Sequence, residues 1–188
     1  MTDALAQSGG AQSVYVKATE EHWKWNLDEA INLYSKFISQ VSDSAQAYFL
    51  RGSAYRSKGL EDKALADFDR ALEKDPNLLD AMFGRGQIYL EKRRYEKAVQ
   101  EMTKLLEKSS DFPGAFRIRG GANMGLSKYQ QAASDLTHAV ETGSDDPQAY
   151  FWRALAYQAL NQPDKALLDL DRSLQLDPKN ASAWYRKG

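Results

Sequence analysis

The hydrophobic positions of this chain predict helices rather than strands. From Leu27 to Ile38, apolar residues recur at the i, i+3, i+4 and i+7 spacing of one helical face. From Ala45 onward, similar stripes predict helices that come in pairs, each pair joined by a short turn. The predicted pairs cover residues 45–58 with 61–74, 80–92 with 95–108, 114–126 with 129–141, and 148–160 with 163–176.

The same pattern returns every 34 residues. Three kinds of position mark the period, and each holds one type of side chain. Small residues stand at Gly52, Gly86, Gly120, Ala154 and Gly188, aromatic residues at Tyr55, Tyr89 and Tyr157, and alanine at Ala30, Ala64, Ala98, Ala132 and Ala166. Such a period predicts an array of two-helix units in which each unit buries its apolar face against its neighbours.

This period and these positions resemble the tetratricopeptide repeat family. The resemblance implies an all-α fold, a right-handed α-solenoid of tandem antiparallel helix pairs, and a role as a protein-binding scaffold. We predict a single array over residues 14–188. Its parts are a degenerate repeat at 14–44, full repeats at 45–78, 79–112, 113–146 and 147–180, and a partial repeat at 181–188.

Residues 1–13 are rich in Gly, Gln, Ser and Ala. They offer too little large apolar surface to offset the entropy lost on ordering, so we expect a flexible tail. Trp23 and Trp25 follow in the degenerate repeat and allow two interpretations. They fold back as a lid over the exposed end of the array, or they form an aromatic pair that binds a partner.

One arginine in each first helix matches a carboxylate in the second helix of the same repeat. The four pairs are Arg51 with Asp67, Arg85 with Glu101, Arg119 with Asp135, and Arg153 with Asp169. Two antiparallel helices that turn at Gly59 would bring the first pair level, and the guanidinium fork suits a carboxylate. We predict structural ion pairs that fix the register of the helices, each nearly neutral for stability because desolvation offsets the attraction.

The resemblance also implies where a partner would bind, because in this family first helices line a concave groove that holds extended peptides or helices. The partner-binding residues implied for this chain are Phe49, Arg56, Phe83, Leu90, Arg117, Gly121, Met124, Phe151 and Tyr185. The aromatic members would supply contact area for an apolar or amphipathic segment. The alternative is that these aromatic side chains pack against adjacent helices.

The helix predicted at 114–126 is unusual because it contains Gly114, Gly120, Gly121 and Gly125. Each internal glycine costs about 1 kcal/mol relative to alanine. Gly114, Gly121 and Gly125 stand near Arg117 and Met124, and their missing side chains would leave a recess with a cation and a soft apolar wall. Sequence drift or a flexible hinge is the alternative interpretation.

Composition argues against several classes of function. A net charge of −1, from 25 basic and 26 acidic residues, provides no basic surface for nucleic acid or an anionic membrane. No apolar run approaches the roughly 20 residues that insertion across a membrane needs. There is no Cys, and His22 and His138 lack metal-ligand spacing. With no phosphate loop or acid–base pair either, we expect no metal, no cofactor and no enzymatic activity.

The leading hypothesis is therefore an adaptor that binds a peptide or helix of another protein. A homo-oligomer is the first alternative, formed when the array ends at Trp184 and Tyr185, or at Trp23 and Trp25, dock on another copy. A regulatory fragment of a larger protein is the second, suggested by the abrupt end at Gly188. Since no signal peptide or membrane segment is recognisable, we expect a soluble chain in the cytoplasm.

Overall fold

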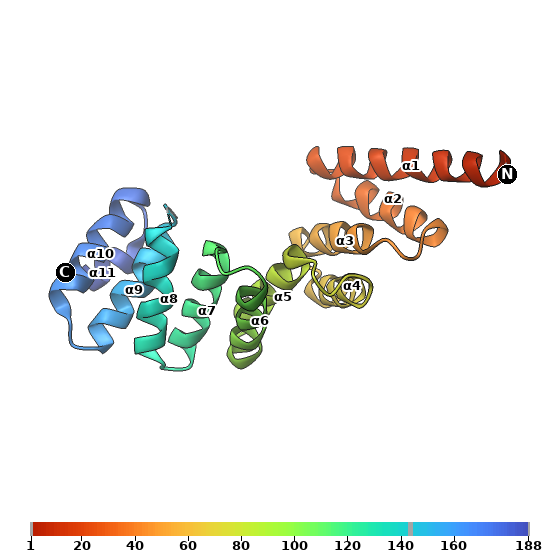
Figure 1. Cartoon of the computed structure of the whole chain (residues 1–188). Helices are drawn as coiled ribbons and strands as arrows, with labels where there is room; N and C mark the ends of the chain where they lie inside the picture. The colour runs from red at the N-terminus through yellow and green to blue at the C-terminus, as the bar shows by residue number, and fades with distance from the viewer. Residues whose placement is uncertain (1, 143–144, 188) are drawn as a thin grey trace. The chain divides into compact units, whose positions relative to one another are not determined.

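The computed structural model describes residues 2–142 and 145–187, and every regular element in those residues is an α-helix (Figure 1). The helices are α1 Thr2–Trp23, α2 Leu27–Gln40, α3 Ala45–Ser57, α4 Glu61–Lys74, α5 Leu79–Glu91, α6 Tyr95–Lys108, α7 Pro113–Gly125, α8 Tyr129–Glu141, α9 Pro147–Ala159, α10 Pro163–Leu176 and α11 Ala181–Lys187.

The predicted all-α fold of paired helices is confirmed, and the helix boundaries agree closely. The second helices α4, α6, α8 and α10 begin and end at the predicted residues. The first helices α5, α7 and α9 each lie one residue closer to the N-terminus than predicted. In α7 and α9 the reason is Pro113 and Pro147, which occupy the first turn, where a missing N–H costs nothing.

The described residues form two compact units, one within residues 1–88 and one within residues 89–188. The boundary falls inside α5. In the first unit α1 packs on α2, α2 on α3 and α3 on α4. In the second, each of the helices from α6 to α11 packs on the next in the chain. A single array over residues 14–188 stays a prediction.

Helix α1 begins at Thr2, within the segment expected to be a tail, and the flexibility of that segment stays a prediction. Ala11 is buried and clusters with Phe37 of α2, and Ala18 is buried beside Tyr34 of α2. Two alanines seven residues apart share one helical face, so this segment covers the apolar side of α2. Its composition suggested a tail because small residues contribute little apolar area of their own, although they allow close packing.

The glycine-rich helix α7 is explained by close packing rather than by a recess. A Cβ atom at Gly121 would lie 2.5 Å from Cζ3 of Trp152 in α9, and one at Gly120 would lie 2.7 Å from Cγ of Leu136 in α8. Both glycines are buried. The recess predicted at Gly121 is therefore wrong: the indole of Trp152 fills the space that the missing side chain leaves.

This packing predicts that Gly121→Ala destabilises the second unit, although alanine is the better helix former. We expect the free energy of unfolding to fall by about 1–3 kcal/mol, because the methyl group overlaps a large aromatic ring in a packed interior. Gly10→Ala is the matched control, since Gly10 lies in α1 with nothing within 4 Å of a built Cβ. This control should raise the free energy of unfolding by up to about 1 kcal/mol. Urea unfolding followed by circular dichroism measures both; equal gains would contradict the packing argument.

Candidate functional site

The arginines of the first helices bind carboxylates of the second helices through two parallel hydrogen bonds. Nε and Nη2 of Arg51 each lie 2.7 Å from an oxygen of Asp67. The pair formed by Arg153 and Asp169 has the same two distances. In the pair formed by Arg119 and Asp135 they are 2.9 and 2.7 Å. The structure thus brings together three of the four predicted pairs as bidentate forks, and it buries all three carboxylates.

Each of these arginines also reaches a third helix. Its Nη1 donates to a hydroxyl of the preceding second helix, at 3.0 Å for Arg51 and 3.3 Å for Arg153. The acceptors are Ser35 in α2, Thr103 in α6 and Thr137 in α8. One guanidinium therefore ties three helices together. The pKa of Arg51 is raised above its ordinary value, chiefly by the hydrogen bond to Asp67.

One of the forks has an additional member. Asn123 stands where other repeats have tyrosine, and its Nδ2 donates to Asp135 at 3.2 Å, so it joins the fork of Arg119. Arg85 donates from Nη1 to Asp69 at 2.6 Å within the first unit. Glu101 is buried in the second unit. The pairing of Arg85 with Glu101 stays a prediction.

An apolar pocket of about 290 Å³ lies between α1 and α3 in the first unit. Here it is named the α1–α3 pocket. Its lining comes from two first helices, the turn after α1, and one residue of α2: Thr19, His22, Trp23, Trp25, Tyr34, Phe49, Leu50 and Ser53. Phe49 was predicted to bind a partner. The ring of Phe49 packs 6.0 Å from that of Phe68, so one side of it is held by the core and the other lines the pocket.

Two tryptophans border this pocket and are largely in solvent. Trp23 is 91% exposed and Trp25 is 68% exposed. The lid interpretation is therefore wrong, because neither indole covers the end of the helical stack. The turn holds them outward: Trp25 has a left-handed backbone with φ of 63°, and Glu21 accepts hydrogen bonds from Lys24 at 2.9 Å and Asn26 at 2.7 Å.

Polar groups at this pocket are few. Nδ1 of His22 lies 3.4 Å from the hydroxyl oxygen of Tyr34. Burial lowers the pKa of His22 and raises the pKa of Tyr34, so both are neutral near pH 7. Arg56, the next predicted cation on α3, donates from Nη1 to Oε1 of Gln87. Within the described part of the chain, no carboxylate pairs with Arg56.

A second pocket of about 390 Å³ lies between the first helices α9 and α11. Here it is named the α9–α11 pocket. It is lined by Phe151, Leu155, Ala181, Ser182, Tyr185 and Arg186. Tyr185 is 84% exposed, whereas Phe151 packs partly against the buried cluster of α10 and α11. The structure thus places two predicted partner-binding residues at one pocket.

The other predicted partner-binding residues lie outside these two pockets. Nε of Arg117 pairs with Asp146 at 2.9 Å, so its charge is already compensated. Met124 packs against the buried cluster between α8 and α9. Phe83 and Leu90 are half-buried, and Gly121 is buried under Trp152.

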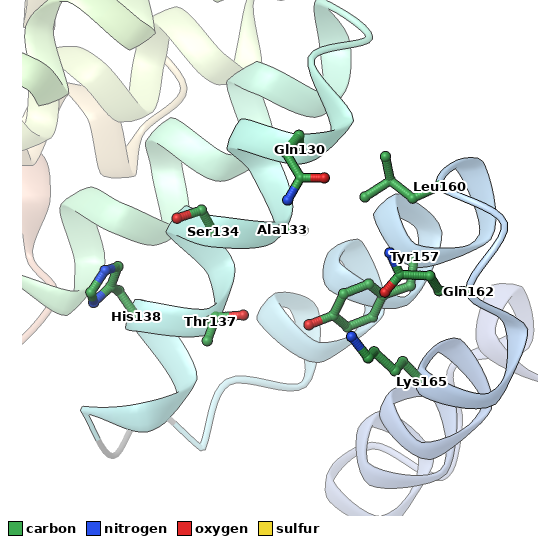
Figure 2. A pocket seen from close by; sticks show the side chains of 9 residues that line it. All are labelled: Gln130, Ala133, Ser134, Thr137, His138, Tyr157, Leu160, Gln162 and Lys165. Atoms are coloured by element: carbon green, nitrogen blue, oxygen red, sulfur yellow. The ribbon is translucent and has the colours of Figure 1, made fainter.

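A third pocket, of about 310 Å³, was not predicted from the sequence. Here it is named the α8–α10 pocket, and Figure 2 shows its lining side chains on two facing sides. One side belongs to α8 and the other to the end of α9 and the start of α10: Gln130, Ala133, Ser134, Thr137 and His138 face Tyr157, Leu160, Gln162 and Lys165. His138 is exposed, and its ring stacks on that of Phe116 with the ring centroids 4.9 Å apart.

The described residues show neither a cluster of metal ligands nor a helix suited to cross a membrane. They contain no group of three or more His, Cys, Asp or Glu side chains placed to hold a metal ion. Over the same residues, no helix combines the length and the hydropathy required of a membrane span.

Comparison with known proteins identifies the repeat. Sequence models described as Tetratricopeptide repeat match residues 26–78 and 62–113, and also 147–180. These stretches cover more than half of the chain. The chain belongs to the tetratricopeptide repeat (TPR) family. The predicted family is confirmed, and membership implies a protein–protein interaction scaffold. No curated protein sequence matches the chain.

Solved structures with this fold include other TPR proteins. YrrB, described as a TPR protein with an unusual peptide-binding site, has a TM-score of 0.80 and 20% identity, covering 99% of this chain and 96% of that chain. MamA protein has a TM-score of 0.78 and 17% identity, covering 93% and 96%. MamA 41-end from Desulfovibrio magneticus RS-1 has a TM-score of 0.81 and 15% identity, covering 91% and 97%. At these identities the likeness shows the fold.

The fork of this TPR protein predicts strong coupling between Arg153 and Asp169, whose side chains are 14% and 7% exposed. Replacing either residue with alanine should cost about 2–4 kcal/mol, because the partner is left buried and unpaired. The double variant Arg153→Met, Asp169→Leu should recover most of that loss, since an apolar pair of similar size removes both desolvation costs. Urea unfolding of the four proteins tests this; additive losses would contradict a coupled pair.

The neutral His22 predicts a pH dependence of stability. Because its pKa in the folded chain is lowered, folding favours the uncharged imidazole. Its contribution is complete above the unfolded pKa of about 6.5 and is lost as pH falls through the lower folded value. Between pH 7.5 and 5, the urea midpoint should therefore fall further in the parent than in His22→Gln. His138→Gln is the matched control, and its urea midpoint should fall by as much as that of the parent. Identical pH profiles for the parent and both variants would contradict the prediction.

Proposed function

We propose that this chain is a non-enzymatic scaffold that binds an apolar peptide or helix of another protein on its first helices. The α1–α3 pocket is the principal contact. The observation that carries the proposal is an apolar cavity of about 290 Å³ bordered by Trp23 and Trp25, both mostly exposed. Exposed indoles beside an apolar cavity lose unfavourable contact with water when a partner covers them.

The pocket combines the features of an energetic centre of binding. The ring of Phe49 is already held against Phe68, so it loses little conformational freedom when a ligand arrives. Trp23 and Trp25 supply large aromatic area, which is enriched in residues that dominate binding energy. Arg56 lies one turn beyond Ser53 on α3 and would contact polar or acidic groups at the edge of the bound segment.

The chemistry of the lining favours an uncharged segment at the centre. His22 and Tyr34 are neutral near pH 7, and none of the lining residues is Asp, Glu, Lys or Arg. A charged side chain placed in this cavity would lose its hydration without gaining a counter-ion. The proposed ligand therefore presents an apolar side chain to the cavity. The description of YrrB as having a peptide-binding site supports a peptide ligand by analogy.

A random peptide library displayed on phage, selected against the parent chain, tests the proposal. Enriched peptides would be titrated against the parent and three variants by tryptophan fluorescence. Ser53→Gln should fill the cavity and weaken binding by roughly tenfold, and Trp23→Ala should weaken it by roughly fivefold. Gln87 already stands 34 residues after Ser53, so a first helix accommodates glutamine at this position.

Leu168→Ala is the matched control, because Leu168 is an apolar side chain on α10 that is 70% exposed and lies outside the pocket. Its affinity should equal that of the parent, and circular dichroism should show all four proteins folded. Peptides that bind every variant equally would refute the α1–α3 pocket as the site.

Self-association is a second candidate function, favoured by the exposed aromatic residues of α11. Trp184 is 53% exposed and Tyr185 is 84% exposed. If α11 mediates contacts between copies, Tyr185→Ala should lower the average mass in light scattering at high concentration, whereas Trp23→Ala should not.

A further inference from the structure

The α8–α10 pocket differs from the two pockets on the first helices in position and in chemistry. Most of its lining belongs to the second helix α8, and the facing side comes from Tyr157 of α9, the turn after α9 and Lys165 of α10 (Figure 2). It shares no lining residue with the α9–α11 pocket. The side chains around it are largely polar, so it does not offer the apolar surface proposed to bind a partner at the α1–α3 pocket.

The pocket exists because some side chains of α8 are smaller than those at the corresponding positions of α6, one repeat earlier, and others are uncharged where those of α6 are charged. Ala133 and Ser134 stand where α6 has Val99 and Gln100. Gln130 and His138 stand where α6 has Glu96 and Lys104. The surface of α8 has thus lost both the bulk that would fill the hollow and the acidic residue that would neutralise it.

The only formal charge on the pocket lining is positive. Lys165 holds its ammonium 5.4 Å from the ring centroid of Tyr157, a cation–π contact that leaves its N–H donors available. None of the nine lining residues is Asp or Glu. Asp164 precedes Lys165 in the chain and does not line the pocket. Over the described residues, no carboxylate pairs with Lys165, so an anionic ligand would find a positive site without a competing counter-ion.

A buried oxygen in the same pocket requires a donor. Oε1 of Gln162 is inaccessible to solvent and, within the described residues, has no hydrogen-bond partner. Buried polar atoms nearly always have a partner. A free carboxylate could not satisfy Oε1 because it has no N–H to donate. A peptide segment carries both groups, acidic oxygens on its side chains and N–H donors on its main chain.

We infer that the α8–α10 pocket binds an acidic segment of a partner protein. The ammonium of Lys165 pairs with a side-chain carboxylate of that segment, the hydroxyl of Ser134 donates to it, and Oε1 of Gln162, once rotation of its side chain exposes it, accepts a main-chain N–H. This site is separate from the proposed α1–α3 site. A chain with both would hold one apolar segment and one acidic segment.

The test uses NMR of the ¹⁵N-labelled full chain titrated with three probes. These are a capped peptide Gly-Glu-Ala-Asp-Gly, its amide analogue Gly-Gln-Ala-Asn-Gly, and sodium acetate at matched ionic strength. The acidic peptide should shift the backbone amide signals of Ser134, Gln162 and Lys165. The amide analogue should leave them in place, because it lacks the carboxylates, and acetate should shift them less than the acidic peptide does.

Two variants with the same change in charge separate the pocket from general attraction. Lys165→Glu should weaken binding of the acidic peptide by about fivefold, the upper value for a partly exposed ion pair. Lys179→Glu, an exposed residue after α10, should not weaken it. Ser134→Trp, at an exposed position, should block the pocket and abolish the shifts while the chain stays folded.

Four results would overturn the inference. They are no shift with the acidic peptide, shifts confined to the first helices, an equal response to acetate, and equal weakening by both lysine variants. Ser53→Gln should leave this titration unchanged, so the outcome is independent of the α1–α3 proposal.

Discussion

Two hydrogen bonds between an arginine of a first helix and an aspartate of the following helix hold three of the repeats in register. Arg51 binds Asp67 in α4 and Ser35 in α2, and it lies over the rings of Tyr48 and Tyr55 at 5.6 and 5.9 Å. A planar fork accepts a carboxylate in few orientations, so the contact sets both the level and the rotation of the helices. As a consequence, positions two residues before and after the arginine, about 200° around the helix, face the other way.

Those positions line the candidate sites. Phe49 and Ser53 flank Arg51 and line the α1–α3 pocket, and Phe151 and Leu155 flank Arg153 and line the α9–α11 pocket. In α7 the corresponding positions around Arg119 are Arg117 and Gly121. In the second unit, Asp146 forms an ion pair with Arg117, and the indole of Trp152 fills the space beside Gly121. The same register thus opens the first-helix surface in α3 and α9 and closes it in α7.

The two surfaces assigned to partners differ in the forces that they would use. The α1–α3 pocket offers aromatic area with neutral polar groups, so its binding would depend on removing apolar surface from water. The α8–α10 pocket offers one ammonium and several hydrogen-bonding groups, so its binding would depend on charge and would weaken with salt. A scaffold with both surfaces would respond separately to two kinds of segment.

The sequence by itself determined the repeat, the boundaries of helices α3 to α10 to within one residue, and three of the forks, because these depend on spacing within about one repeat. The family resemblance included Phe49, Phe151 and Tyr185 among the expected partner-binding residues, and each of them lines a pocket. The tertiary structure alone decided how space is filled. Whether Gly121 leaves a recess depends on Trp152, 31 residues away, and the exposure of Trp23 depends on the left-handed turn at Trp25. The α8–α10 pocket arises from side-chain volumes on facing helices, which no single periodic pattern records.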